Sequence, residues 1–200
     1  MFSGIIADVG HIVSASDRDG GLRLAIATHA LDLSDVQAGD SIAVNGVCLT
    51  VVEHSADRFS VDVSRETLNC TEGLDTIGAL VNLEKALRLS DRLDGHLVSG
   101  HVDGVGVVIE FSDQGESWKL EVCAPQALAK YIAVKGSITI NGVSLTINQV
   151  RGNDFSVNLI PYTLAITNLK NLRAGNRVNL EIDLIARYVE RMMQTKKGQD

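Results

Sequence analysis

The sequence has few cysteines, and their arrangement excludes two kinds of small protein. Cys48, Cys70 and Cys123 are an odd number at scattered spacings, with no CxxC pair and no Cys/His ligand set. Disulfide frameworks need paired cysteines, and structural zinc sites need clustered ligands at short spacings. We therefore expect neither a disulfide scaffold nor a metal site, and free thiols are typical of a reducing cytoplasm.

The chain also lacks a long hydrophobic run and an excess of positive charge. No apolar stretch approaches the roughly 18 residues that a membrane-spanning helix needs, and Met1–Ile6 has no basic region of a signal peptide. The net charge of −7 argues against a nucleic-acid surface. No glycine-rich phosphate loop or strand–helix–strand unit is present, which argues against a dinucleotide-binding oxidoreductase. A small neutral ligand is compatible with all of these absences.

The dominant feature that is present is an internal repeat. Ser41–Thr50, with the sequence SIAVNGVCLT, returns as Ser137–Thr146, with the sequence SITINGVSLT. The offset of 96 residues holds without a gap over residues 3–68 and 99–164, and the match continues after a one-residue slip. A period this long is too large for a solenoid unit, so we predict two copies of one domain. Two copies of a pocket suit chemistry that uses two copies of a ligand.

Each copy shows short strands separated by turn signals, which predicts a small barrel or sandwich. Asn45-Gly46 and Asn141-Gly142 favour the positive φ angles of a type I′ turn and therefore predict two tight hairpins. We expect strands over residues 5–13, 22–27, 41–44, 47–53, 59–63 and 80–83, and over 101–109, 118–122, 137–140, 143–149, 155–159 and 178–182. Short helical turns are expected near Leu31 and over residues 126–131. Six strands per copy are enough for a closed barrel.

The predicted fold is all-β: two tandem six-stranded antiparallel barrels related by internal duplication, followed by an α-helix. The N-terminal barrel spans residues 1–86, a linker 87–96, the C-terminal barrel 97–183, and the helix and tail 184–200. The helix is amphipathic, because its apolar residues recur on one face. It could pack on its own barrel or mediate self-association. Since it has no counterpart in the first copy, self-association is favoured.

Alternation along the strands predicts which side chains face out of each barrel. On the second hairpin strand, Val47, Leu49 and Val51 should fill the core, which places Cys48 and Thr50 outside. Ser144 and Thr146 hold the matched positions in the second copy. An ordinary solvated surface would account for one such strand. Short polar groups at matched positions in both copies, without Lys or Glu, instead indicate a groove for a flat heterocycle. Asp62, Glu66 and Asn158 could bind the hydroxyls of a sugar-like chain.

The copies also differ at positions that could carry catalysis. Ile5, Gly39, Cys48 and Ala86 become His101, Lys135, Ser144 and Asp183. A histidine can transfer protons near neutral pH, and serine or cysteine can act as a nucleophile when a neighbour activates it. The simpler alternatives are a structural histidine, a small buried cysteine and a lysine in a surface turn. His96 precedes the repeat and is a weaker candidate, with a hydrogen-bonding role in the linker.

Four segments taken together resemble the riboflavin synthase family of lumazine-binding-domain enzymes. They are Met1–Ile6, Gly39–Thr50, Gly95–Asp103 and Ile160–Leu164. The likeness spans essentially the whole chain, including the duplication and the last helix. Two departures stand out: Ser3 replaces the usual Thr, and Tyr162 stands where His or Glu is common.

The resemblance implies Greek-key barrels, a homotrimer held by the C-terminal helices, and no metal or redox cofactor. It implies conversion of two 6,7-dimethyl-8-ribityllumazine molecules into riboflavin and 5-amino-6-ribitylamino-uracil by transfer of a four-carbon unit. Each active site would lie between the N-terminal barrel of one subunit and the C-terminal barrel of its neighbour. Lumazine synthase is a further partner that the resemblance suggests.

The family's ligand contacts carry over residue by residue. In the first copy they fall on Phe2, Gly4, Ile5, Ile6, Cys48, Leu49, Thr50, Asp62, Val63, Ser64, Arg65, Glu66 and Thr67. In the second copy they fall on Gly100, His101, Val102, Lys135, Ser144, Leu145, Thr146, Asn158, Leu159, Ile160, Pro161, Tyr162 and Thr163. The residues matching positions implicated in turnover are His101, Ser144, Cys48, Thr146, Lys135 and Asp183. His101 is the expected proton-transfer group, and Ser144 or Cys48 activates or supplies the nucleophile.

The main alternative is a non-catalytic lumazine or flavin carrier of the bioluminescence antenna type. Such relatives lose the Gly-His…Gly-His segment. Here His96, His101 and Ser144 are all present, which favours the enzyme.

Overall fold

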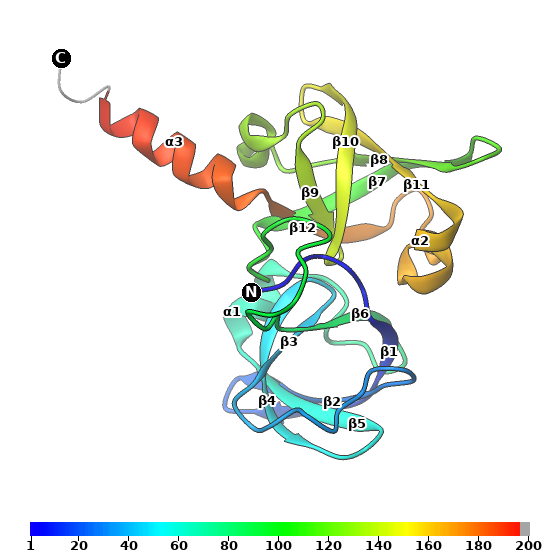
Figure 1. Cartoon of the computed structure of the whole chain (residues 1–200), viewed down its shortest axis with the longest axis vertical. Coiled ribbons are helices and arrows are strands. Elements are labelled where there is room, and N and C mark those ends of the chain that lie inside the picture. The colour runs from blue at the N-terminus through cyan, green and yellow to red at the C-terminus, as the bar shows by residue number, and fades with distance from the viewer. Residues whose placement is uncertain (197–200) are drawn as a thin grey trace.

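The computed structural model describes residues 1–196, so the last four residues of the predicted tail lie outside the described part. Two closed antiparallel barrels lie one above the other, and a helix projects from the second (Figure 1). The first barrel comprises β1 (Asp8–Arg18), β2 (Gly21–Ala27), β3 (Ser41–Val44), β4 (Val47–His54), β5 (Arg58–Val63) and β6 (Leu80–Lys85). The second comprises β7 (Gly104–Asp113), β8 (Trp118–Cys123), β9 (Ser137–Ile140), β10 (Val143–Arg151), β11 (Asp154–Leu159) and β12 (Arg177–Ile182).

Both barrels close in the same cyclic order of strands. The first runs β1-β2-β5-β4-β3-β6, and the second follows the equivalent order from β7 to β12. In the first barrel, β3, β4 and β5 are consecutive neighbours, and β6 returns to lie beside β3. This is the Greek-key order, and β9 to β12 repeat it in the second barrel. The predicted all-β duplication is therefore confirmed. Asn45, Gly46, Asn141 and Gly142 all have positive φ, as a type I′ turn requires.

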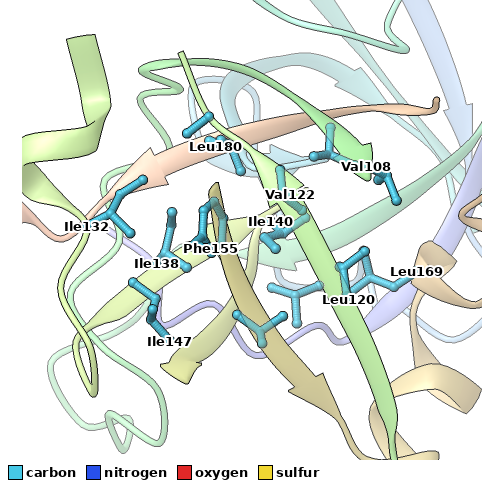
Figure 2. Close-up of a cluster of buried hydrophobic side chains, with 14 of the residues drawn as sticks. Val108, Leu120, Val122, Ile132, Ile138, Ile140, Ile147, Phe155, Leu169 and Leu180 are labelled. Carbon is cyan, nitrogen blue, oxygen red and sulfur yellow. The ribbon is translucent and has the colours of Figure 1, made fainter. Parts of the chain in front are cut away.

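The inward-facing residues agree with the predicted alternation. Val47, Leu49 and Val51 of β4 are buried, and so are the alternating apolar residues of β5. Figure 2 shows the same arrangement in the second barrel, where Phe155 and Ile140 lie among aliphatic side chains from neighbouring strands. Each barrel has its own apolar core, as a closed six-stranded barrel filled by its own side chains should.

Several predicted element bounds are wrong. β1 begins at Asp8 and β7 at Gly104, three residues after the predicted starts. Two short helices were not predicted, α1 (Arg65–Cys70) and α2 (Pro161–Ile166), because six residues are too few to show a helical period. Their start signals are local: Ser64 caps α1, and Pro161 opens α2.

The two connections predicted to contain helical turns behave differently. Residues 126–131 form η1 (Gln126–Tyr131), a 3₁₀ helix, as expected. The segment near Leu31 is not helical. There the carboxylate of Asp8 accepts the backbone N–H groups of His29, Ala30 and Leu31, which holds the chain in another shape. The second copy has Gly104 in place of Asp8 and cannot form this cluster. A second 3₁₀ helix, η2 (Asn168–Asn171), precedes β12.

The segments that lead into the two barrels are exchanged between them. The N-terminal segment runs between the barrels before entering β1 (Figure 1), and Ile6 packs in the second core. Its counterpart, Val102, packs against the first core. At the crossing point, Phe2 and Val98 form an antiparallel bridge with reciprocal N–H···O contacts of 2.8 and 3.1 Å.

Asparagine side chains connect the barrels below this crossing. Asn82 Nδ2 donates to the Asn141 carbonyl at 3.0 Å, and Asn179 Nδ2 donates to the Asn45 carbonyl at 3.1 Å. Asn82 and Asn179 are matched in the repeat, so the two bonds are related by an approximate two-fold axis. Both side chains are buried. Because a buried amide without partners is costly, these four groups fix how the barrels sit together.

The two Asn-Gly turns meet at the same axis and allow a matched test of the interface. A Cβ on Gly46 would lie 2.7 Å from the Gly142 nitrogen, whereas a Cβ on Gly20 would meet nothing within 4 Å. Both glycines have φ above +80°. We expect Gly20→Ala to lose about 1–2 kcal/mol of unfolding free energy from backbone strain alone.

Gly46→Ala should lose more than this control, because the barrels must also move apart. Urea unfolding of both variants measures the difference. Equal losses would show that the turn contact contributes nothing to holding the barrels together.

Candidate functional site

At two places the hairpin strand of one barrel meets the leading segment of the other copy, and we call these the candidate grooves, the first at Cys48 and the second at Ser144. Ser144 N–H donates to the Gly4 carbonyl at 2.8 Å, and Cys48 N–H donates to the Gly100 carbonyl at 2.8 Å. Gly4–Ile6 therefore lies beside the second barrel and Gly100–Val102 beside the first. The sequence had suggested the reverse grouping. The reason is that β1 and β7 begin late, so the residues before them are free to cross.

Glycine is required at both crossing points. Gly4 and Gly100 each have φ of 77°. A Cβ at Gly4 would lie 2.6 Å from the Ser144 Cβ, and one at Gly100 would lie 2.6 Å from the Cys48 Cβ. Only a residue without a side chain can bring the crossing backbone this close to the strand.

Two buried glutamates hold the crossing segments, and sequence reasoning missed both. Glu84 accepts the N–H groups of Ser3 and Gly4 at 2.6 and 2.9 Å. Glu181, its match in the repeat, accepts the N–H groups of Ser99, Gly100 and His101 at 2.7, 2.9 and 3.1 Å. Burial raises the pKa of both carboxyls, against the effect of these hydrogen bonds. The sequence did contain a signal for these two residues, because a Glu is retained in both copies at a strand position that faces out of the barrel.

The hairpin strand leaves an open edge at each groove. β4 pairs with β5 from Val51 onward, whereas Cys48–Thr50 pairs with β3. β10 has the same pattern, with Ser144–Thr146 paired to β9 and the β11 ladder starting at Ile147. Thr50 and Thr146 are exposed. A strand edge beside a short hydroxyl offers the alternating donors and acceptors that a heterocycle needs.

The remaining predicted contacts lie at the end of a strand and the start of a short helix in each barrel. In the first barrel they are Asp62–Thr67, and in the second they are Asn158–Thr163. Asp62 is not free, because Arg23 holds its carboxylate in two bonds of 2.7 and 2.8 Å. Asp62–Arg65 instead line a cavity of about 620 Å³ together with the β1–β2 turn. Another cavity, of about 640 Å³, lies beside β3 and β6 and includes Ile5.

The two grooves differ in chemistry. Cys48 lies against an apolar cluster of Phe2, Ala43, Val98 and Ala86. Ser144 instead contacts His96, with 2.7 Å between Oγ and Nδ1. Burial lowers the pKa of His96, and the charge of Asp183 opposes this by raising it. His96 is thus a functional candidate that the repeat comparison could not rank, because it has no counterpart in the first copy.

The histidine, lysine and aspartate that the second copy gains do not gather in one place. His101 follows Gly100 and lies on the Cys48 side of the first barrel. Lys135 occupies a left-handed turn at φ 66° and donates its N–H to Ile147 of the second barrel. Asp183 follows β12, near His96. The sequence had grouped these three residues only as positions that the second copy gains. The crossing moves His101 to the first barrel, whereas Lys135 and Asp183 stay with the second.

Comparison with known proteins agrees with this geometry. A model of the lumazine binding domain matches residues 3–86 and again 99–183. The chain therefore belongs to the lumazine-binding-domain family, with one domain per barrel.

Curated relatives match over nearly their full length. A riboflavin synthase of Photobacterium leiognathi is 47% identical over 98% of this chain and 91% of its own. The riboflavin synthase of Photobacterium phosphoreum is 43% identical and covers 100% of this chain and 92% of its own length. That of Brucella abortus is 42% identical and covers 98% of this chain and 100% of its own length. Among solved structures, LumP in complex with riboflavin is similar at a TM-score of 0.81 and 30% identity, covering 91% of this chain and 99% of LumP. LumP in complex with 6,7-dimethyl-8-(1'-D-ribityl) lumazine is similar at a TM-score of 0.79 and 29% identity, and it too covers 91% of this chain and 99% of LumP.

The buried Glu181 gives a test of how the crossing segment is held. Glu181→Gln replaces one acceptor oxygen with an amide donor, so at least one buried N–H loses its partner, at about 1–3 kcal/mol. Because the folded-state pKa is raised, the native protein binds the proton more tightly than the unfolded chain. The stabilisation this gives is complete below the ordinary pKa near 4.5 and is lost as pH rises through the folded value.

The loss caused by Glu181→Gln, measured by urea unfolding, should therefore be larger at pH 4.5 than at pH 8. Glu116→Gln, on the exposed β7–β8 turn, serves as the control and should change stability little at either pH. A loss that grows with rising pH would contradict the assigned pKa direction.

Proposed function

We propose that the chain is a riboflavin synthase, which converts two 6,7-dimethyl-8-ribityllumazine molecules into riboflavin and 5-amino-6-ribitylamino-uracil. The observation that carries this is the near full-length identity with curated riboflavin synthases. Each chain carries two related grooves, and the first groove of one chain facing the second groove of a neighbouring chain fits a reaction whose two substrates are the same molecule. Proximity then supplies much of the rate, because both partners are already reactive.

In the proposed reaction, one groove binds the lumazine that donates four carbons and the other binds the acceptor. A base removes a proton from the 7-methyl group of one molecule, and a nucleophile adds at C7 of the other. His101, on the Cys48 side, is the proposed proton-transfer group. Thr50 and Thr146, beside their open strand edges, are proposed to bind the ring edges. Lys135 and Asp183 supply charge on the Ser144 side, and no metal or redox cofactor is required.

A non-catalytic carrier is the second candidate, because LumP has the same fold and was crystallised with lumazine and riboflavin. The enzyme is favoured because the synthases share more identity with this chain than LumP does.

We further propose that the protein works as a homotrimer in the cytoplasm, with each active site formed between two subunits. α3 (Leu184–Lys196) points away from both barrels (Figure 1). Two residues in the first half of α3 hold it to the second barrel. Arg187 pairs with Asp103 at 2.6 Å, and Glu190 contacts Lys130 and Tyr131. Yet Ile185 and Tyr188 are each 63% exposed. An apolar helix face without cover in the monomer supports association through α3. Association with lumazine synthase is a further proposal that rests on the family resemblance.

In the described part of the chain, none of the helices is long and apolar enough to cross a membrane.

The activity can be tested with purified protein and 6,7-dimethyl-8-ribityllumazine, with no cofactor added. One riboflavin should form for every two lumazines consumed, as followed by absorbance and chromatography. Tight binding of the lumazine without turnover would identify a carrier instead.

The role of α3 can be tested by truncation. A chain ending at Asp183 lacks α3 and should sediment as a monomer and lose activity, because each site needs a neighbouring subunit. A chain ending at Lys196 keeps the whole helix and is the matched control. If the shorter chain still sediments as a trimer, the barrels and not α3 hold the assembly.

A further inference from the structure

His96 is held in one orientation behind Ser144. Its backbone N–H donates to the Ser3 carbonyl at 3.1 Å, and Ser3 is itself bound to the buried Glu84. Its ring presents Nδ1 to the Ser144 oxygen at 2.7 Å. The other ring nitrogen, Nε2, is buried and has no hydrogen-bond partner within residues 1–196. Among the described residues the ring therefore makes one hydrogen bond, to the Ser144 hydroxyl, and the charge of Asp183 acts on it from beyond hydrogen-bond distance.

We propose that His96 is a positioning residue that fixes the Ser144 hydroxyl as a hydrogen-bond donor toward the ligand of the second groove. This inference rests on the proposed function and goes beyond it. It assigns Ser144 a role different from the nucleophile that the sequence suggested.

The position of the imidazole proton follows from the burial of Nε2. A neutral imidazole carries its proton on one nitrogen and a lone pair on the other. A buried N–H without an acceptor is rarer in proteins than an under-satisfied acceptor. The proton therefore lies on Nδ1, and Nδ1–H donates to Ser144 Oγ.

That bond determines what Ser144 can do. With one oxygen lone pair occupied by Nδ1–H, the hydroxyl hydrogen is directed away from His96. The Gly4 carbonyl already accepts the Ser144 N–H, so the hydroxyl is the donor that Ser144 can offer to a ligand of the second groove. The hydroxyl then donates to a ring nitrogen or carbonyl oxygen of a bound heterocycle. It cannot lose its proton to His96, because Nδ1 has no lone pair to accept it, so Ser144 is not activated as a nucleophile.

The first groove has no histidine that orients a hydroxyl donor in this way. Cys48 occupies the matched position, a thiol is a weak donor, and the neighbouring side chains are apolar. Asp183, on the Ser144 side, is replaced there by Ala86. Two identical ligands are therefore polarised differently, and the one in the second groove is made the more electron-poor.

The proton position can be measured directly, without any assay of activity. Long-range ¹H–¹⁵N NMR of the histidine-labelled full chain should show His96 as the Nδ1–H tautomer, with the signal identified by its loss in His96→Asn. A Nε2–H tautomer would overturn the proposal. Because this readout does not depend on turnover, it separates failure of the inference from failure of the proposed function.

Kinetics of three variants test the consequence. His96→Leu removes the donor and should lower kcat by about 100-fold with little change in KM, as expected for a lost preorganised contact. Ser144→Ala should cause a loss of the same size. The double variant should be no slower than Ser144→Ala, because both changes remove one interaction. Losses that multiply would show that the two residues act separately.

A conservative variant distinguishes positioning from folding. The side-chain amide of His96→Asn can place an N–H where Nδ1 lies, so it should keep kcat within about threefold of the wild type. His54→Leu, an exposed histidine at the end of β4, is the matched control and should have full activity. If His96→Asn is as slow as His96→Leu while both remain folded by circular dichroism, the proposal fails.

Discussion

The exchange of the leading segments is the constraint on which the rest of the structure depends. Glu84 and Glu181 each bind a turn of backbone that has left its own barrel, and the receiving strand approaches closely because Gly4 and Gly100 have no side chain. Neither groove exists in one copy alone. Each requires a strand from one half and backbone from the other.

The barrels are joined by directional contacts in addition to the apolar packing of the crossed segments. Amides from matched asparagines donate across the interface to the carbonyls of the two hairpin turns, and those turns touch through glycine. Such bonds specify one arrangement, whereas apolar contact alone would allow sliding. The same Asn-Gly turns that fold the hairpins therefore also fix how one barrel sits on the other.

The repeat made the strands and hairpins predictable, because alternation and Asn-Gly turns act locally. It also ranked Cys48, Ser144 and their threonines correctly as outward residues. It could not show that Ile5 and His101 precede their strands and cross to the other barrel, since that depends on long-range contacts with Glu181 and Glu84. The repeat could not rank His96, because a residue outside the repeat has no partner for comparison. α1 and α2 were missed because their signals are confined to a cap and a proline.

The crossing also bears on how the two halves diverged. The histidine encoded in the second half lies beside the first barrel, and the isoleucine encoded in the first half lies beside the second. A chain made of two identical first halves would pair cysteine with isoleucine in both grooves, and one made of two second halves would pair serine with histidine in both. Only the unlike combination gives cysteine with histidine in one groove and serine with isoleucine in the other. A substitution in one half is therefore selected through the barrel of the other, so neither half can change independently.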